Sequence, residues 1–143
     1  MSSAGAVIIG RYRTALDTVA VLPSDVRDLR GLDESEVLEI NKLHTDLARR
    51  VGSAGAVIAG DLAYRSRPEL GGDGLARRTG HRTVEILLKT TTGQTKEQVI
   101  TAVRAGTLLT DIADDGTADP VTGEIREATQ PWLRCVAAAV AAG

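Results

Sequence analysis

The sequence has 143 residues and a formal net charge of −2, which is enough length for one domain with its own core but too little positive charge for a general polyanion binder. Aromatic residues are scarce, with two Tyr, one Trp and no Phe, and this composition favours helices over sheets. A single cysteine excludes an internal disulfide and fits a reducing cytoplasm. No segment reaches the ~18 apolar residues of a membrane span. We therefore expect a cytoplasmic, all-α protein without a membrane partner.

Residues 1–66 predict a long helical hairpin. Apolar residues recur at three-to-four spacing over residues 3–21, until Pro23 ends the first helix. Asp33 and Glu36 then form a capping-box pattern, after which apolar side chains alternate steps of three and four as far as Leu62. We assign this stripe to helix packing or coiled-coil dimerisation, through Val37, Ile40, His44, Leu47, Val51 and Ile58.

Small residues and a histidine mark this second helix. Gly52, Ala56 and Gly60 lie four residues apart on one face, where small side chains let a partner helix approach closely. The alternative is a kink between Gly52 and Gly55, because glycine weakens a helix. His44 lies within the apolar stripe, and we expect it to be a buried, hydrogen-bonded histidine of the core or of an interface, not a metal ligand.

Residues 67–109 predict a cluster of short helices with glycine corners. A proline and three glycines open the cluster as a loop, and Asp73 is expected to cap a helix that Gly80 terminates. Thr83 caps the next helix, which Gly93 ends, and a second capping box at Thr95 opens the third. The three helices are expected at residues 74–79, 84–91 and 95–109. Their spacing resembles a helix-turn-helix unit, in which one helix can enter the major groove of DNA.

Charge is separated along the second half of the chain. Residues 65–89 contain six Lys and Arg against three carboxylates, a local charge of +3, whereas residues 111–129 contain six Asp and Glu against Arg126, a local charge of −5. We interpret residues 110–129 as an exposed acidic loop, with a hairpin, a lid or a mobile segment as alternatives. Its aspartates lack the regular spacing and closing Glu of an EF-hand, so we expect no metal.

Residues 130–143 predict a terminal helix with Pro131 at its first position. Trp132 is expected to anchor this helix in the core, and Cys135 is expected to be a small buried side chain. The chain ends where a helix would normally lead into another element, so we expect it to be a fragment of a longer protein.

Several stretches together resemble one known family. They are LAYRSRPELGGDGLARRTGHRTVE at 62–85, TGQTKEQV at 92–99, VRAGTLL at 103–109, and QPW at 130–132 with the alanine-rich end that follows. The family is the domain of unknown function 222, the N-terminal helical region of HNH-endonuclease-domain proteins in high-GC Gram-positive bacteria. The resemblance covers roughly residues 33 to 143. It implies a helical region that precedes a nuclease domain and locates DNA, dimerises or positions the nuclease.

No catalytic constellation is visible in the sequence. The two histidines, His44 and His81, lie far apart along the chain and there is no Cys-x-x-Cys pair, so an HNH centre would belong to residues beyond Gly143. We therefore expect no enzyme activity, no cofactor and no small-molecule substrate.

The leading hypothesis is a non-catalytic nucleic-acid-binding or DNA-positioning module whose partner is double-stranded DNA. The alternative is a self-associating helical module, a homodimer without nucleic-acid binding, in which the basic cluster is a solvated face or pairs with the acidic loop. Under the leading hypothesis, the residues that contact nucleic acid are Arg65, Arg67, Arg77, Arg78, His81, Arg82 and Lys89.

Overall fold

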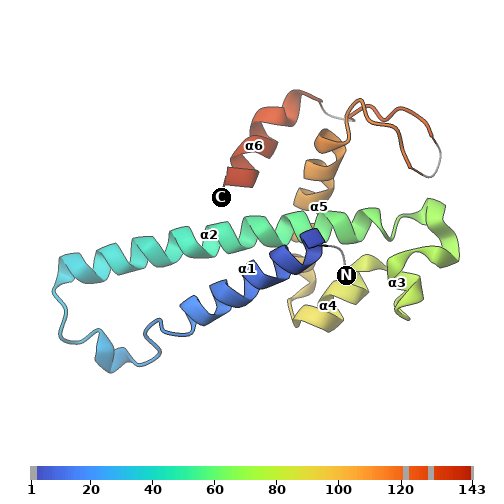
Figure 1. Cartoon of the computed structure of the whole chain (residues 1–143). Coiled ribbons are helices and arrows are strands. Elements are labelled where there is room, and N and C mark those ends of the chain that lie inside the picture. Colours follow the sequence, from blue (N-terminus) through green and yellow to red (C-terminus); the bar gives the residue numbers. More distant parts are fainter. Residues whose placement is uncertain (1–2, 121–122, 129–130, 143) are drawn as a thin grey trace. The chain divides into compact units, whose positions relative to one another are not determined.

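The computed structural model describes residues 3–120, 123–128 and 131–142 (Figure 1). Within these residues the chain forms α-helices and short 3-10 helices and no named strand, so the all-α prediction is confirmed. None of the described helices is long and apolar enough to cross a membrane. In chain order the helices are α1 (Ser3–Val19), η1 (Val26–Asp28), α2 (Glu34–Tyr64), η2 (Pro68–Asp73), α3 (Leu75–Arg78), α4 (Val84–Thr92), α5 (Lys96–Ala113), η3 (Pro131–Leu133) and α6 (Arg134–Ala142).

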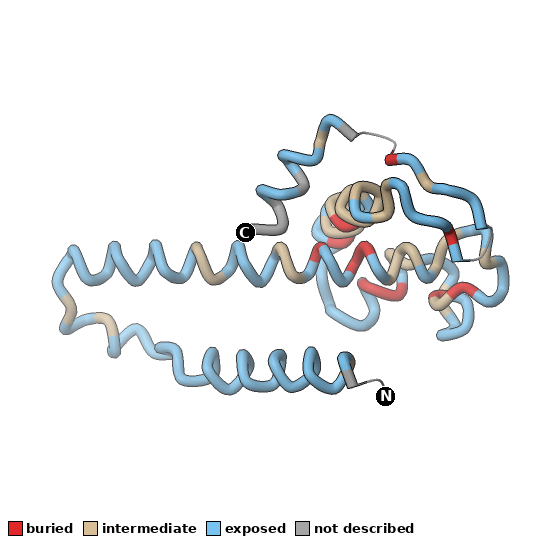
Figure 2. Tube along the Cα trace, turned by 45° about the horizontal axis from the view of Figure 1, so that its top comes forward, coloured by how far each residue is buried: buried red, intermediate tan, exposed pale blue. Residues whose placement is uncertain are grey.

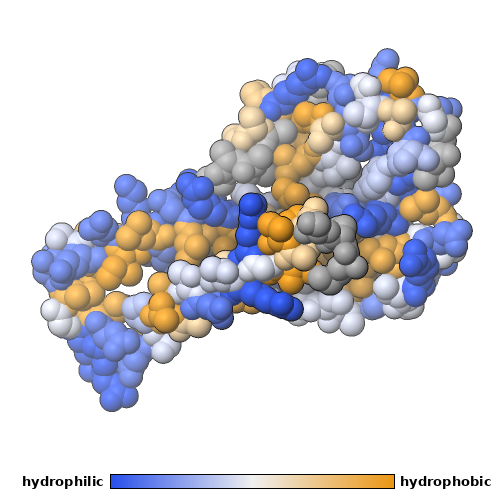
Figure 3. Space-filling model, viewed as in Figure 1, coloured by the Kyte–Doolittle hydropathy of each residue, from blue (hydrophilic) through white to orange (hydrophobic). Residues whose placement is uncertain are grey.

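The chain divides into two compact units, Met1–Leu43 and His44–Gly143, and α2 contributes to both. In the first unit a capping box begins α2 as predicted, because Glu36 N–H donates to Asp33 Oδ1 and Asp33 N–H donates to Glu36 Oε2, each over 2.9 Å. No described residue of this unit is buried (Figure 2). Hydrophobic side chains instead reach the surface of its helices (Figure 3), which leaves apolar area available for further packing.

The second unit has a core where the second half of α2 meets α4 and α5 (Figure 2). Ala59, Leu88 and Val99 are buried there, one from each helix. Partly buried apolar side chains surround them, namely Leu62, Val84, Ala102 and Val103. The core therefore positions α4 and α5, which carry Lys89, Lys96 and Arg104.

Helices α2 and α5 cross with their backbones in contact. A β-carbon built on Gly60 would lie 2.9 Å from the α-carbon of Gly106, closer than real side chains allow. Ala56 is buried at the same crossing, so the predicted close approach of a helix to this face is confirmed at Ala56 and Gly60. A β-carbon on Gly52 would meet no atom within 4 Å, and α2 continues through Gly52 and Gly55 as one helix.

Turn residues largely begin and end the short helices as predicted. Gly80 and Gly93 adopt positive φ angles of 82° and 69°, which favour glycine at helix ends. The side chains of Thr83 and Thr95 each accept a hydrogen bond from the backbone N–H three residues on. The prediction for Asp73 is wrong, because this residue ends η2 and α3 follows a glycine that provides no side-chain cap.

The acidic segment after α5 folds back on itself as a hairpin, one of the three alternatives for it. An isolated antiparallel bridge pairs Ala118 with Ile125, and Asp119 N–H donates to the carbonyl of Glu124 over 2.8 Å. Asp119 and Ala128 are 6% and 8% exposed. The expectation of an exposed loop is therefore wrong at these residues, since part of the hairpin packs against the rest of the unit.

Helix α6 packs against α5, and Pro131 begins the 3-10 turn that leads into it. Trp132 is 70% exposed and Cys135 is exposed, so the expected burial of both side chains is wrong. Cys135 lies in α6 and Trp132 in the 3-10 turn before it, and the packing of α6 on α5 leaves both side chains in water.

Candidate nucleic-acid interface

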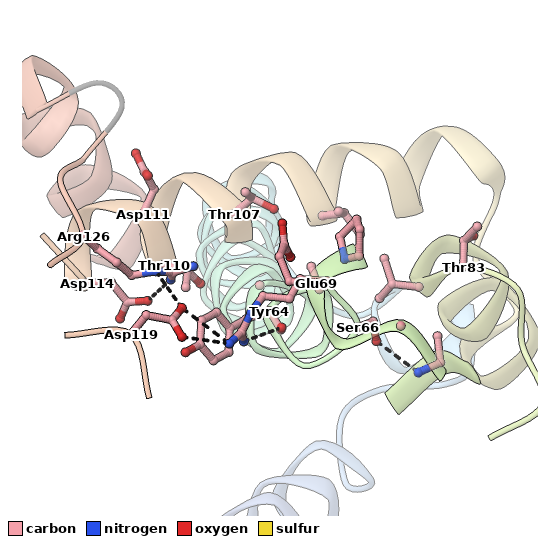
Figure 4. A pocket seen from close by; sticks show the side chains of 18 of the residues that line it. Tyr64, Ser66, Glu69, Thr83, Thr107, Thr110, Asp111, Asp114, Asp119 and Arg126 are labelled. Atoms are coloured by element: carbon pink, nitrogen blue, oxygen red, sulfur yellow. Dashed lines mark hydrogen bonds and ion pairs between the residues drawn. The ribbon is translucent and has the colours of Figure 1, made fainter. Parts of the chain in front are cut away.

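Two arginines and two aspartates join the acidic hairpin to the end of α2 (Figure 4). The guanidinium of Arg67 lies 3.3 Å from Asp119 Oδ1, and that of Arg126 bridges Asp119 over 3.2 Å and Asp114 over 2.7 Å. Both guanidiniums also lie over the ring of Tyr64, 4.1 Å and 5.0 Å from its centroid. Because the side chains of Arg67 and Asp119 are only 12% and 6% exposed, their ion pair is largely buried and holds the hairpin in place.

This network changes the role expected for the first two basic residues. The guanidinium of Arg67 also donates to the carbonyl of Tyr64 over 3.1 Å, so its donors face acceptors inside the protein. Arg67 therefore pairs with the acidic segment, one of the two interpretations of the basic cluster, and its guanidinium is not available to nucleic acid. Arg65 remains exposed, but it pairs with Asp61 one turn earlier in α2 over 2.7 Å.

Asp115 links the hairpin to α6. Its carboxylate accepts a hydrogen bond from the N–H of Ala128 over 2.9 Å and pairs with Arg134 at the start of α6. The Ala128 N–H, followed by the Arg134 guanidinium, holds the pKa of Asp115 below its usual value. The folded structure therefore favours the ionised form of Asp115.

Four of the sequence-predicted cations lie together along α3, the turn after it and α4. They are Arg77, Arg78, Arg82 and Lys89, and all four are exposed. In the parts of the chain that the structure describes, none of the four forms an ion pair with a carboxylate. Three carboxylates of the acidic segment, Asp114, Asp115 and Asp119, are instead paired with other arginines, and these four charges face solvent.

His81 lies in the turn between these cations and is half-buried. Its backbone N–H donates to the carbonyl of Ala76 over 2.7 Å, and its Nδ1 lies 3.3 Å from the hydroxyl of Thr79. These contacts give His81 a role in shaping the turn, which supports the arginines on either side of it.

Two further cations were not among the residues selected from the sequence. Lys96 and Arg104 of α5 line a groove of about 570 Å³ together with Lys89 of α4, and all three side chains are exposed. The groove also contains Glu85 and an apolar side chain of α5, Ile100. The spacing 96, 100 and 104 places these α5 positions on one helical face, and this was the signal in the sequence that could have identified them.

A larger groove of about 890 Å³ opens beside the ion-pair network (Figure 4). Arg77 and Arg82 line one part of it, whereas Thr107, Thr110 and Asp111 of α5 line another. Its lining mixes cations, hydroxyls and carboxylates, so it has no single charge preference. Among the described residues no group of three or more His, Cys, Asp or Glu side chains could hold a metal ion.

The apolar stripe of α2 remains largely exposed. Val37, Ile40, Val51 and Ile58 are 40%, 37%, 62% and 43% exposed. Leu47 is half-buried, whereas His44 is exposed, so a place for His44 in the core of this chain is wrong, and its place in an interface stays a prediction. The stripe positions therefore contribute little to the core of one chain, and their role in dimerisation stays a prediction.

Comparisons of the chain with protein-family models, curated proteins and solved structures found no match in any of the three. The resemblance to the domain of unknown function 222 thus stays an expectation from the sequence, and the assignment of function rests on the geometry described above.

Proposed function

We propose that the chain is a non-catalytic nucleic-acid-binding module that binds double-stranded DNA through the exposed cations of α3, α4 and α5. The observation that supports this most strongly is the separation of charge. Asp114, Asp115 and Asp119 are paired with Arg67, Arg126 and Arg134, while the cations of α3 to α5 face solvent without a carboxylate partner in the described residues. The proposed contact residues are Arg77, Arg78, Arg82, Lys89, Lys96 and Arg104.

The local charge balance favours an anionic partner. Residues 75–104 contain these six cations against Glu85 and Glu97, a net charge of +4 within a chain whose total is −2. Phosphate oxygens spaced along a nucleic acid would neutralise several cations at once, whereas a single small anion would neutralise one or two.

The helix arrangement favours a duplex. Helices α4 and α5 are joined by three residues, with Gly93 in the left-handed conformation and Thr95 capping α5. A short turn of this kind is typical of helix-turn-helix units, in which phosphate contacts fix the orientation of a helix in the major groove. In this arrangement Lys96 at the start of α5 and Arg104 two turns later would make such contacts.

Under the resemblance to HNH-associated proteins, this module would locate DNA or position a nuclease domain, and cleavage would belong to that domain. We expect the module to act in the cytoplasm, where Cys135, which is exposed, would remain reduced.

The proposal can be tested by fluorescence anisotropy with a labelled duplex of ~25 base pairs at low salt. We expect binding by the wild-type chain, and an affinity loss of roughly 10- to 100-fold in either of two triple variants, Arg77/Arg78/Arg82→Ala and Lys89/Lys96/Arg104→Ala, because each removes up to three phosphate contacts. The matched control is Arg11/Arg13/Arg30→Ala, which removes the same charge from exposed positions of the first unit and should bind nearly as the wild type does.

Two results would overturn the proposal. One is the absence of duplex binding at low salt even at high protein concentration. The other is an equal loss of affinity in the control variant, since that would make binding a consequence of total charge and not of this surface.

A further inference from the structure

Helix α2 carries an apolar stripe whose spacing fits a partner helix. Val37, Ile40 and Val51 are 40%, 37% and 62% exposed, although each is a large hydrophobic residue. With Ala54 included, the stripe positions from residue 37 to residue 58 alternate steps of three and four, which is the heptad repeat of a coiled coil. Apolar side chains that remain exposed in this register are available to a second helix.

The charges beside the stripe favour a second copy of this chain as the partner. Glu36, Leu43 and Arg50 are seven residues apart, so they follow one another along the same flank of the stripe. All three side chains are exposed, and Leu43 is 60% exposed. Glu36 and Arg50 each lie seven residues from Leu43, on opposite sides of it along the chain. If a second copy of the helix runs in the opposite direction, the acidic residue of each copy therefore faces the basic residue of the other.

We propose that the chain self-associates through α2, with the α2 helix of a second copy running antiparallel to the first. Glu36 of each copy then meets Arg50 of the other, and the two Leu43 side chains meet at the two-fold axis. In this register Val37 packs against Leu47 of the second copy, and Ile40 packs against His44. The surface thus becomes self-complementary, as a two-fold interface requires.

The two kinds of contact have different roles. Exposed ion pairs contribute little affinity, so the two Glu36–Arg50 pairs mainly select the antiparallel direction. A parallel pair would place Glu36 near Glu36 and Arg50 near Arg50 of the other copy, which removes the complementarity. Affinity comes from burial of the apolar stripe, and self-association should therefore depend only weakly on salt.

Disulfide cross-linking tests the register directly. In a Cys135→Ser background, Leu43→Cys should form a covalent dimer under mild oxidation. The matched control is Leu38→Cys, which replaces a leucine that is 68% exposed and lies away from the stripe and its flank, and it should cross-link far more slowly. When Glu36→Cys and Arg50→Cys chains are mixed, the antiparallel arrangement predicts the mixed disulfide, whereas a parallel arrangement predicts the two homodimeric disulfides.

Light scattering coupled to size-exclusion chromatography provides the second measurement. The wild-type chain should form a dimer that persists at high salt, and Leu43→Asp should be monomeric with unchanged helical circular dichroism, while Leu38→Asp stays dimeric. A wild-type chain that is monomeric at high concentration would overturn the proposal, as would a preference for homodimeric disulfides in the mixture. Either result would leave the proposed DNA-binding surface on α3 to α5 unaffected.

Discussion

Gly60 of α2 lies against Gly106 of α5 so closely that a β-carbon on Gly106 would fall 2.7 Å from the α-carbon of Gly60. Both residues are buried, and the contact brings two backbones together without side chains between them. The crossing places α5 on α2, and α5 in turn carries Lys96 and Arg104 of the proposed DNA-binding surface. The position of that surface therefore depends on two residues without side chains.

Gly60→Ala should strongly destabilise the second unit, because the added methyl group would have to push α5 away from α2. Overpacking of a well-packed core costs about 1–3 kcal/mol, and we expect a loss at the upper end of this range because the atoms in the way belong to the backbone. Urea unfolding followed by circular dichroism would measure the change in the free energy of unfolding.

Gly52→Ala is the matched control in the same helix. A β-carbon there would meet no atom within 4 Å, so the substitution should increase the free energy of unfolding by roughly 0.5–1 kcal/mol through helix propensity alone. Equal effects of the two substitutions would contradict the close crossing.

The ion pair between Arg67 and Asp119 should contribute substantially to stability. Removal of one partner leaves a largely buried charge without its counterion, which typically costs about 3–5 kcal/mol. We expect both Arg67→Ala and Asp119→Ala to lower the free energy of unfolding by nearly this amount. In Asp119→Ala, Arg126 also loses a partner. In a double-mutant cycle the two changes should be clearly non-additive, and additive effects would mean that the pair does not form in solution.

Acidification should loosen the attachment of α6 to the hairpin. The pKa of Asp115 is lower in the folded chain than in the unfolded chain, so its ionised form stabilises the fold above the unfolded pKa of ~4, and this stabilisation is lost as the pH falls through the folded value. Trp132, two residues before Arg134, is the only tryptophan of the chain, and its fluorescence should report the change.

Asp115→Asn keeps an oxygen that can accept the Ala128 hydrogen bond but removes the charge that pairs with Arg134. In this variant the Trp132 signal should resemble the acid form already at neutral pH. A wild-type acid transition that persists unchanged in Asp115→Asn would assign the effect to another carboxylate.

The sequence predicted those features that depend on neighbours within a few residues. The capping boxes at Asp33 and Thr95 and the left-handed glycines at Gly80 and Gly93 each involve contacts inside one helical turn, and all four are confirmed. The face of α2 that approaches another helix was also predictable, because Gly60 repeats at helical spacing with other small residues.

Contacts between distant segments could not be read in the same way. Arg67 and Asp119 are 52 residues apart, and nothing local distinguishes Arg67, which is buried by this pair, from Arg77, which faces solvent. The exposure of Trp132, in the turn before α6, likewise depends on how α6 meets α5. The apolar pattern of residues 131–142 does not specify that contact.

The proposed DNA-binding function is tested most directly by the salt dependence of duplex binding. A plot of the logarithm of the association constant against the logarithm of salt concentration has a slope of roughly −0.9 for each phosphate contact. For the six cations of α3 to α5 we predict a slope of roughly −4 to −5, reduced by about 3 units in Arg77/Arg78/Arg82→Ala if each arginine contacts a phosphate. A slope near zero, or a steep slope that the triple substitution leaves unchanged, would contradict the assignment of this surface to DNA.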